Sequence, residues 1–198
     1  MVRESQCEWA LWFRSNYKNY KKVPPSIDLE EWKRKHARLV REFRNKLESK
    51  GVNVSTEMQN KFSLEESGII ISGQPDLVGV WGDSVTVYEC KTGKPQSYDV
   101  TQALLYMYYI PRCKEAYKSS KPNGCIVYYD GSKIEIPNSK INEEFLKDLD
   151  YCFNIVLSNT PPVKRPSEQE CESCDISSTD CPERVEPSQN KRRRGTSI

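Results

Sequence analysis

Two short apolar runs on either side of Gly82 and Asp83 constrain the fold of this chain more than any other feature. The runs are Leu77–Trp81 and Val85–Tyr88, and both have the composition of β-strands. A glycine and an aspartate between two such runs predict a tight β-hairpin, because glycine supplies the positive φ that two-residue turns require. If Gly82 and Asp83 are the loop residues, the last residue of the first run pairs with Ser84.

The predicted hairpin brings three charged side chains together at its open end. Counting back along both strands puts Asp76 directly opposite Glu89, and directly opposed residues have Cβ atoms about 5 Å apart. Lys91 lies two residues beyond Glu89, so it shares the same face of the sheet. Two carboxylates so placed can share one divalent cation, and without it one of them should bind a proton more tightly. We expect both carboxylates to face solvent. A surface hairpin that carries ordinary charges would give the same sequence pattern.

The sequence Pro75-Asp76, followed by Glu89-Cys90-Lys91, resembles the motif of the PD-(D/E)xK nuclease superfamily. The resemblance implies a restriction-endonuclease-like α/β fold, in which a mixed sheet is flanked by helices. It also implies metal-assisted hydrolysis of phosphodiester bonds. Asp76, Glu89 and the backbone carbonyl of Cys90 would hold Mg²⁺ or Mn²⁺, and Lys91 would stabilise charge on the phosphate or position the attacking water.

The segment from Gln102 to Tyr106 lies at the start of an apolar run of helical length, Thr101–Ile110. Residues four apart project from one face of a helix, so both side chains should point the same way. The pair resembles the Q-x-x-x-Y motif of RecB-type nucleases, which implies that Gln102 and Tyr106 hold DNA beside the metal. Ordinary helix packing would also account for the pair.

His36 is the only histidine of the chain. It lies in the charged stretch 29–50, whose apolar residues Trp32, Leu39, Val40 and Phe43 recur at helical spacing. A lone histidine beside such a stripe is more often packed than functional. RecB-like nucleases, however, carry a histidine metal ligand on a helix upstream of the aspartate strand, and this resemblance implies that role for His36. One imidazole ligand favours Mn²⁺ somewhat over Mg²⁺. Glu57 is similar to a further acidic position of these nucleases.

Three cysteines near the C-terminus, Cys171, Cys174 and Cys181, have the spacing C-x2-C-x6-C-P. Three thiolates cannot complete a four-cysteine site, and Cys7 is the natural fourth candidate. Zinc also takes four thiolates, although zinc ribbons usually show two C-x2-C pairs. Disulfides are not expected, since no apolar signal-peptide run follows the first four residues. The remaining cysteines are expected to be packed thiols: Cys90, Cys113, Cys125 and Cys152.

One N-terminal and three C-terminal cysteines resemble the iron–sulfur RecB-family nucleases. The layout from Cys7 to Val185 is most similar to the CRISPR-associated Cas-four exonucleases and their virus-borne relatives. This resemblance implies a 4Fe–4S cluster that joins the two ends of the domain as an appendage. It also implies a cytoplasmic enzyme that degrades mainly single-stranded DNA from the 5′ end, with some endonuclease activity. Its roles would be CRISPR adaptation or viral DNA processing, and the CRISPR integrase complex is a candidate partner.

The composition sets wider bounds. The chain has 198 residues, of which 36% are apolar, enough for one sizeable domain with a core. A net charge of +2 does not by itself indicate a nucleic-acid-binding protein. The stretch 14–22 interleaves basic residues with tyrosines, which suits phosphate contacts and base stacking or, equally well, a solvated helix face. No apolar run approaches the roughly 18 residues of a membrane span.

Four regions follow along the chain. Residues 1–25 form an N-terminal helical segment, 26–160 the nuclease core, 161–185 the cysteine segment and 186–198 a disordered basic tail. Helices are expected at 4–20, 26–50, 101–117 with a kink at Pro111, and 141–157; strands are expected at 57–62, 69–80, 85–91, 124–129 and 133–136.

Two other functional classes remain open. One is a non-catalytic nucleic-acid-binding protein or scaffold that retains the nuclease fold, although such a protein has no need of Asp76, Glu89 and Lys91. The other is a zinc-containing regulator, in which the basic run 191–194 would bind phosphate or direct nuclear import. The sequence does not indicate an oligomeric state.

Overall fold

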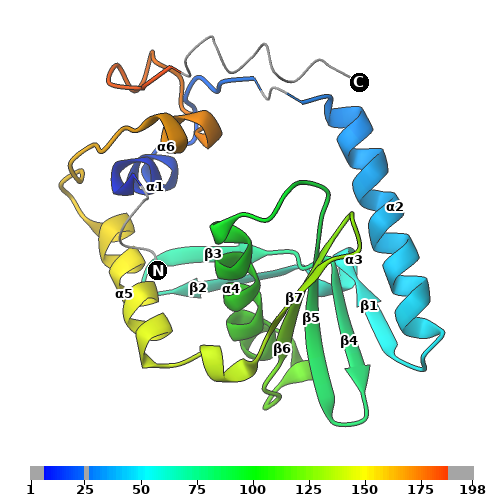
Figure 1. The fold of residues 1–198 in the computed structure, drawn as a ribbon. Coiled ribbons are helices and arrows are strands. Elements are labelled where there is room, and N and C mark those ends of the chain that lie inside the picture. Colours follow the sequence, from blue (N-terminus) through cyan, green and yellow to red (C-terminus); the bar gives the residue numbers. More distant parts are fainter. Residues whose placement is uncertain (1–6, 25–26, 187–198) are drawn as a thin grey trace. The chain divides into compact units, whose positions relative to one another are not determined.

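The computed structural model describes residues 7–24 and 27–186, which divide into two compact units. One unit consists of residues 27–145. The other joins the N-terminal segment 7–24 to the C-terminal segment 146–186 (Figure 1). The four regional boundaries expected from the sequence stay predictions. Residues 187–198, including the basic run 191–194, lie outside the described residues.

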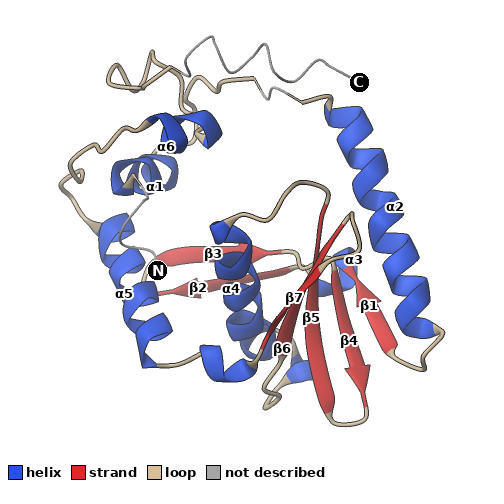
Figure 2. Cartoon of the chain, viewed as in Figure 1, coloured by secondary structure: helices blue, strands red, loops and turns tan. Residues whose placement is uncertain are grey.

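A five-stranded mixed sheet forms the centre of the unit 27–145 (Figure 2). Its strands, in spatial order, are β1 (Asn53–Thr56), β4 (Leu77–Trp81), β5 (Ser84–Lys91), β6 (Asn123–Tyr128) and β7 (Lys133–Ile136). Only β5 and β6 pair in parallel, and the helix α4 (Ser97–Cys113) makes the crossover that parallel strands require. The expected α/β fold with a mixed sheet and flanking helices is confirmed.

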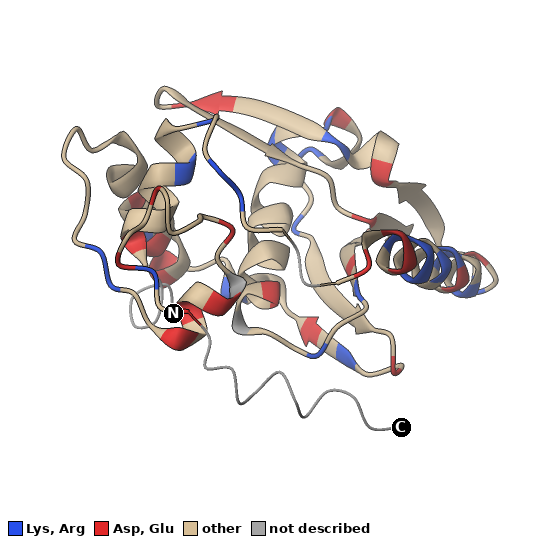
Figure 3. Cartoon of the chain, turned by 90° about the horizontal axis from the view of Figure 1, so that it is seen from above, with Lys and Arg blue, Asp and Glu red and all other residues tan. Residues whose placement is uncertain are grey.

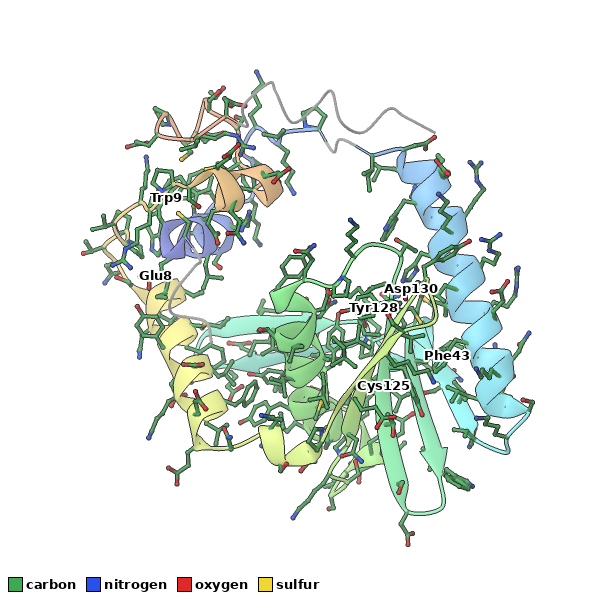
Figure 4. The ribbon with its side chains drawn as sticks, viewed as in Figure 1. Glu8, Trp9, Phe43, Cys125, Tyr128 and Asp130 are labelled. Carbon is green, nitrogen blue, oxygen red and sulfur yellow. The ribbon has the colours of Figure 1, made fainter. Side chains whose placement is uncertain are left out.

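The long helix α2 (Leu29–Glu48) packs on one face of this sheet. Its first turn is capped by Asp28, whose side chain accepts hydrogen bonds from the next two free amides. Three leucine and phenylalanine side chains then form its buried stripe. They pack against apolar residues of β4, β5 and β6 in one cluster that includes Phe43 and Cys125 (Figure 4). Successive strand residues point to opposite faces, so Glu89 and Lys91 point away from α2 toward α4.

A second sheet has two strands, β2 (Phe62–Glu66) and β3 (Ile69–Gly73). The expected strand over 57–62 is wrong, because residues 57–60 form the short helix α3 (Glu57–Asn60) between β1 and β2. Gln59 caps this helix by accepting a hydrogen bond from the Thr56 amide, which ends β1. The expected single strand over 69–80 is also wrong. It divides into β3 and β4 around Pro75, which lacks an amide hydrogen for a continuous ladder.

The other unit contains three helices, α1 (Glu8–Asn16), most of α5 (Glu143–Leu157) and α6 (Glu168–Ser173). Aromatic residues of α1 form its core with Ile155 and Ile176. The N-terminal and C-terminal segments of this unit contact each other directly, since the Val23 amide donates a 2.8 Å hydrogen bond to the Asp175 carbonyl. None of the helices in the described ranges has both the length and the apolar character that a bilayer crossing requires.

Several helix boundaries differ from those expected. Within the described residues α1 ends at Asn16 rather than near residue 20, because the following segment is extended and bridges to Ile176. Helix α4 begins four residues earlier than expected, since Asp99 caps the Gln96 amide. It includes Pro111 and ends at Cys113, where a short 3-10 turn η1 (Glu115–Tyr117) follows. The second hairpin, formed by β6 and β7, is confirmed.

Candidate active site

The β4–β5 hairpin has the predicted register. Trp81 pairs with Ser84, and Gly82 has the expected positive φ of 55°. The ladder ends at Leu77, so Asp76 lies one residue beyond it. There the Asp76 carboxylate replaces a backbone partner by accepting a 2.7 Å hydrogen bond from the Cys90 amide. The hairpin therefore fixes Asp76 directly beside Glu89 and Cys90.

Both hairpin carboxylates are buried, which corrects the expectation that they face solvent. Asp76 and Glu89 are each 6% exposed. Asn60 of α3 is itself fully buried and donates a 3.2 Å hydrogen bond to the carbonyl of Pro75, the residue before Asp76. Asn60 thus holds the backbone immediately before Asp76. Nothing in the sequence singled it out, because one asparagine in a short polar stretch carries no periodicity or motif.

Three potential metal ligands converge at this end of the sheet. Ligand atoms of His36, Glu57 and Asp76 all lie within 4.8 Å of one another. His36 Nε2 is 3.3 Å from Asp76 Oδ2, and this carboxylate raises the pKa of the imidazole. Two carboxylates and one imidazole are donors that suit Mg²⁺ or Mn²⁺, so the residues present fit such an ion. Glu57, the weakest of the sequence candidates, is part of this group.

Glu89 lies next to the group of three without belonging to it. Its Oε1 accepts a 3.1 Å hydrogen bond from Lys91, whereas its buried Oε2 has no hydrogen-bond partner among the described residues. Burial and the negative charge of Asp76 raise the pKa of Glu89 to about 7, although Lys91 opposes the shift. A buried carboxylate oxygen without a partner is costly unless a cation or a proton satisfies it.

The Lys91 ammonium is surrounded by acceptors from two elements. It donates to Glu89 on its own strand and to Gln102 Oε1 on α4 at 2.6 Å, and lies 3.8 Å from Asp99 Oδ1. The buried Asp99 also accepts a 3.0 Å hydrogen bond from the Tyr128 hydroxyl. Burial and this bond raise the pKa of Tyr128 to about 12. Asp99 was not anticipated from the sequence, where its position three residues before Gln102, on the same helical face, was the available signal.

Gln102 and Tyr106 share one helical face, as predicted. Gln102 Nε2 donates a 3.0 Å hydrogen bond to the Tyr106 hydroxyl. Tyr106 also lies against Gly73, where an added Cβ would approach its ring to 2.7 Å and the Phe62 ring to 2.6 Å. Only glycine fits there, so the segment leading to Asp76 can pass close to α4. The role of Gln102 and Tyr106 in holding DNA stays a prediction, and so does the role of the Cys90 carbonyl as a metal ligand.

The raised pKa of Glu89 predicts a pH-dependent stability of the metal-free protein. The folded state keeps a proton that the unfolded state has already lost, so the free energy of unfolding should fall as pH rises from about 4.5 to 7. His36 also lowers the stability as pH rises. Its pKa is raised in the folded state, so the stabilisation by the protonated imidazole is lost as pH rises through that folded-state pKa.

We expect Glu89→Gln to flatten this slope and to stabilise the protein at pH 8 by about 3 kcal/mol at most, since one pKa unit corresponds to about 1.4 kcal/mol. Urea unfolding in EDTA at pH 5 and pH 8 measures the effect, with Asp83→Asn at the exposed hairpin turn as the control. A slope for Glu89→Gln equal to that of the wild type would contradict the assignment.

The four motif cysteines lie in the unit formed by the chain ends, and all are free thiols. Cys171 and Cys181 are buried, and burial raises the pKa of Cys181, with further contributions from the nearby Cys171 and Cys7. Two sulfur atoms accept hydrogen bonds. Arg14 Nη2 donates to Cys174 Sγ at 3.4 Å, and the Val185 amide donates to Cys171 Sγ at 3.4 Å.

Arg184 organises the cysteine segment and was not anticipated. Its side chain is 5% exposed and donates hydrogen bonds to the carbonyls of Cys171 and Cys174 at 2.6 and 2.9 Å. Of the other four cysteines, Cys90 and Cys125 are buried in the sheet unit and Cys113 is partly buried on α4 of that unit, whereas Cys152 is partly buried on α5 in the same unit as the motif cysteines.

The basic, tyrosine-rich stretch 14–22 makes contacts within its own unit. Arg14 and the Tyr20 hydroxyl both reach the Asp175 carboxylate at 2.8 Å, and Lys22 lies 3.6 Å from it. These contacts join the stretch to the cysteine segment and offset part of its charge.

Comparison with known proteins agrees with this geometry. No curated protein matches the chain. Eight chains of solved structures match it. Among them, the crystal structure of SSO0001 has a TM-score of 0.51 and 17% sequence identity over 94% of this chain and 90% of that chain, a likeness of fold. The family model of the PD-(D/E)XK nuclease superfamily matches residues 3–181, and the chain therefore belongs to the PD-(D/E)XK nuclease superfamily.

Proposed function

We propose that the protein is a metal-dependent deoxyribonuclease that degrades mainly single-stranded DNA from its 5′ end. The observation that carries this proposal is the convergence of His36, Glu57 and Asp76 beside the unpartnered oxygen of Glu89. Three acidic groups gathered around one imidazole repel one another, and this arrangement is suited to a divalent cation. Membership of a nuclease superfamily makes nucleic acid the expected substrate.

Each group of residues in the site would have a separate role in the reaction. His36, Glu57 and Asp76 would hold Mg²⁺ or Mn²⁺, with the free oxygen of Glu89 and the Cys90 carbonyl completing the ligand set. When bound, the ion polarises the scissile phosphate and lowers the pKa of water, which supplies a nucleophile at neutral pH. Lys91, oriented by its three acceptors, would stabilise the negative charge that develops on the phosphate.

Gln102 and Tyr106 would hold the DNA strand against this site. Gln102 already connects Lys91 to Tyr106, so a phosphate or sugar oxygen bound there would lie next to the Lys91 ammonium. The 5′ polarity, the role in CRISPR adaptation or viral DNA processing, and the integrase partner depend on the family resemblance alone.

We further propose that Cys7, Cys171, Cys174 and Cys181 hold a 4Fe–4S cluster. Amide and guanidinium donors to two of the sulfur atoms fit thiolates, because hydrogen bonds to sulfur are a regular feature of cluster sites. The apolar packing of Trp9, Phe13 and Ile176 around them would limit solvent access.

The number of C-x2-C pairs favours a cluster over zinc. Zinc ribbons usually have two such pairs, whereas this sequence has one, from Cys171 to Cys174. Iron and zinc analysis of the purified protein, with its absorption near 400 nm, separates the two alternatives.

Digestion of end-labelled DNA tests the proposed activity. The wild type with Mn²⁺ should degrade a single strand from the 5′ end, and a blunt duplex of the same sequence should be degraded more slowly. Strands labelled at the 5′ end and at the 3′ end distinguish the two polarities. Binding of both DNAs without any cleavage in Mn²⁺ or Mg²⁺ would favour the non-catalytic alternative.

A metal titration tests the role of His36. Loss of one ligand should raise the Mn²⁺ concentration for half-maximal activity of His36→Ala at least tenfold, on the order of effects seen at metal sites, and excess Mn²⁺ should partly restore the rate. The control is Lys33→Ala on the exposed face of α2, which should leave the metal dependence unchanged. A lower melting temperature with unchanged metal dependence would show that His36 is a packing residue.

A further inference from the structure

Trp32 is an exposed aromatic side chain next to the candidate metal group. It continues the helical stripe of α2 one turn beyond His36, where the sequence pattern predicts a packed residue. Instead it is 42% exposed. The first turns of α2 extend past the ends of the strands, so the sheet does not cover this part of the helix (Figure 1).

The Trp32 indole is stacked on the His36 ring. The two ring centroids are 5.3 Å apart and the planes differ by 17°. His36 in turn contacts Asp76 at 3.3 Å. The indole is therefore in line with the metal group, separated from Asp76 by one imidazole ring, and its exposed surface can stack against another flat ring.

The net charge of α2 suits a phosphate chain. This helix carries seven lysine and arginine residues and four acidic residues (Figure 3). Glu30 and Glu31 of its first turn pair with Lys33 and Lys35, and the helix as a whole keeps an excess of basic residues. Arg38, two residues after His36, lies 5.4 Å from the ring of Tyr129. Tyr129 is itself 44% exposed and donates its amide to the Lys91 carbonyl at 2.9 Å. The surface beside the site thus combines cations with exposed aromatic rings.

We infer that Trp32 is a nucleobase-binding residue, which stacks on an unpaired base of a DNA strand whose neighbouring phosphate reaches the metal group. Stacking on an aromatic side chain tolerates any base, but it requires that the base is not paired within a duplex. The inference rests on the proposed nuclease function and assigns to one residue the preference for single strands.

Equilibrium binding to two strands tests the inference at the level of the base. One strand is a thymidine decamer, and the other is an abasic decamer with the same number of phosphates. Full-length protein carrying Lys91→Ala limits cleavage during the measurement, which is made by fluorescence anisotropy with Mn²⁺ at fixed salt. This reference protein should bind the thymidine strand about tenfold more tightly than the abasic strand, within the range of one or two stacked bases.

Added to this background, Trp32→Leu should reduce the preference for thymidine to near unity and leave the abasic affinity unchanged. Trp32→Tyr, which keeps a flat ring, should retain most of it. Trp81→Leu is the matched control, since Trp81 is 71% exposed at the distant hairpin turn, and it should retain all of the preference. Equal weakening of both strands by Trp32→Leu would overturn the inference and assign the indole to support of His36. No effect on either strand would also overturn it.

Cleavage by the wild type separates this inference from the proposed function. Normal Mn²⁺-dependent cleavage combined with an undiminished thymidine preference in the Trp32→Leu protein refutes only the stacking role. Absence of cleavage by the wild type, with a preference that depends on Trp32, refutes the nuclease function and supports the base-binding site.

Discussion

Lys91→Ala should lower the rate of DNA cleavage by about 10²–10³-fold, the effect expected when one preorganised charge on the transition state is lost. Its ammonium is held by Glu89, Gln102 and Asp99, so its position is set before substrate binds. Glu89→Ala should reduce cleavage at least as strongly, because it removes a candidate ligand. The measurement is the single-turnover rate on labelled single-stranded DNA at saturating Mn²⁺.

The fold should survive the loss of Lys91. Glu89 would lose the hydrogen bond that Lys91 donates to its Oε1, but its pKa is raised to about 7, so it can bind a proton rather than remain charged. The melting temperature in EDTA should therefore change by only a few degrees. Lys94→Ala, an exposed lysine in the loop after β5, is the matched control and should retain full activity. A Lys91→Ala protein with near wild-type rate would remove this residue from the mechanism.

Cys7→Ser and Cys174→Ser should each cause a large and equal loss of stability, with loss of brown colour. Linking Cys7 to the C-terminal cysteines closes a loop of about 165 residues, and by the loop-entropy argument used for disulfides this is worth several kcal/mol. A domain of this size is stable by only about 5–15 kcal/mol. Iron content, absorption near 400 nm and thermal unfolding measure the effect.

Cys113→Ser is the control for this prediction, because Cys113 lies on α4 in the other unit and should be nearly silent. Full iron content in Cys7→Ser, together with loss of iron in Cys113→Ser or Cys152→Ser, would identify a different fourth ligand. That result would move the cluster and leave the nuclease assignment unchanged.

The hairpin and its register could be predicted because they depend on local chemistry. Gly82 permits the positive φ of the turn, and the two-residue period of the strands then places Glu89 and Lys91 on one face. The pairing of Gln102 with Tyr106 follows in the same way from the helical period. These features need only a few neighbouring residues, so the sequence contains all the information that determines them.

The surroundings of the site could not be predicted, because they depend on contacts between distant segments. Asn60 reaches Pro75 across fifteen residues, and Tyr128 reaches Asp99 across twenty-nine. The burial of Asp76 and Glu89 results from α3 and α4 closing over the hairpin, and a hairpin considered alone would expose both. The wrong strand over 57–62 has a local origin instead, because Gln59 accepts a hydrogen bond from the Thr56 amide three residues earlier and so favours the start of α3 over a continued strand.

The Asp76→Asn variant provides the most direct measurement of the central claim, that this site holds a catalytic metal. Asp76 contacts His36, lies within the three-ligand group and accepts the Cys90 amide, so asparagine can keep the shape while removing the charge. Mn²⁺ binding by electron paramagnetic resonance and cleavage of single-stranded DNA would be followed in the same samples, with Asp83→Asn as the control. We expect Asp76→Asn to lose both Mn²⁺ binding and cleavage while Asp83→Asn keeps both. Retention of Mn²⁺-dependent cleavage at the wild-type rate by Asp76→Asn would contradict the claim.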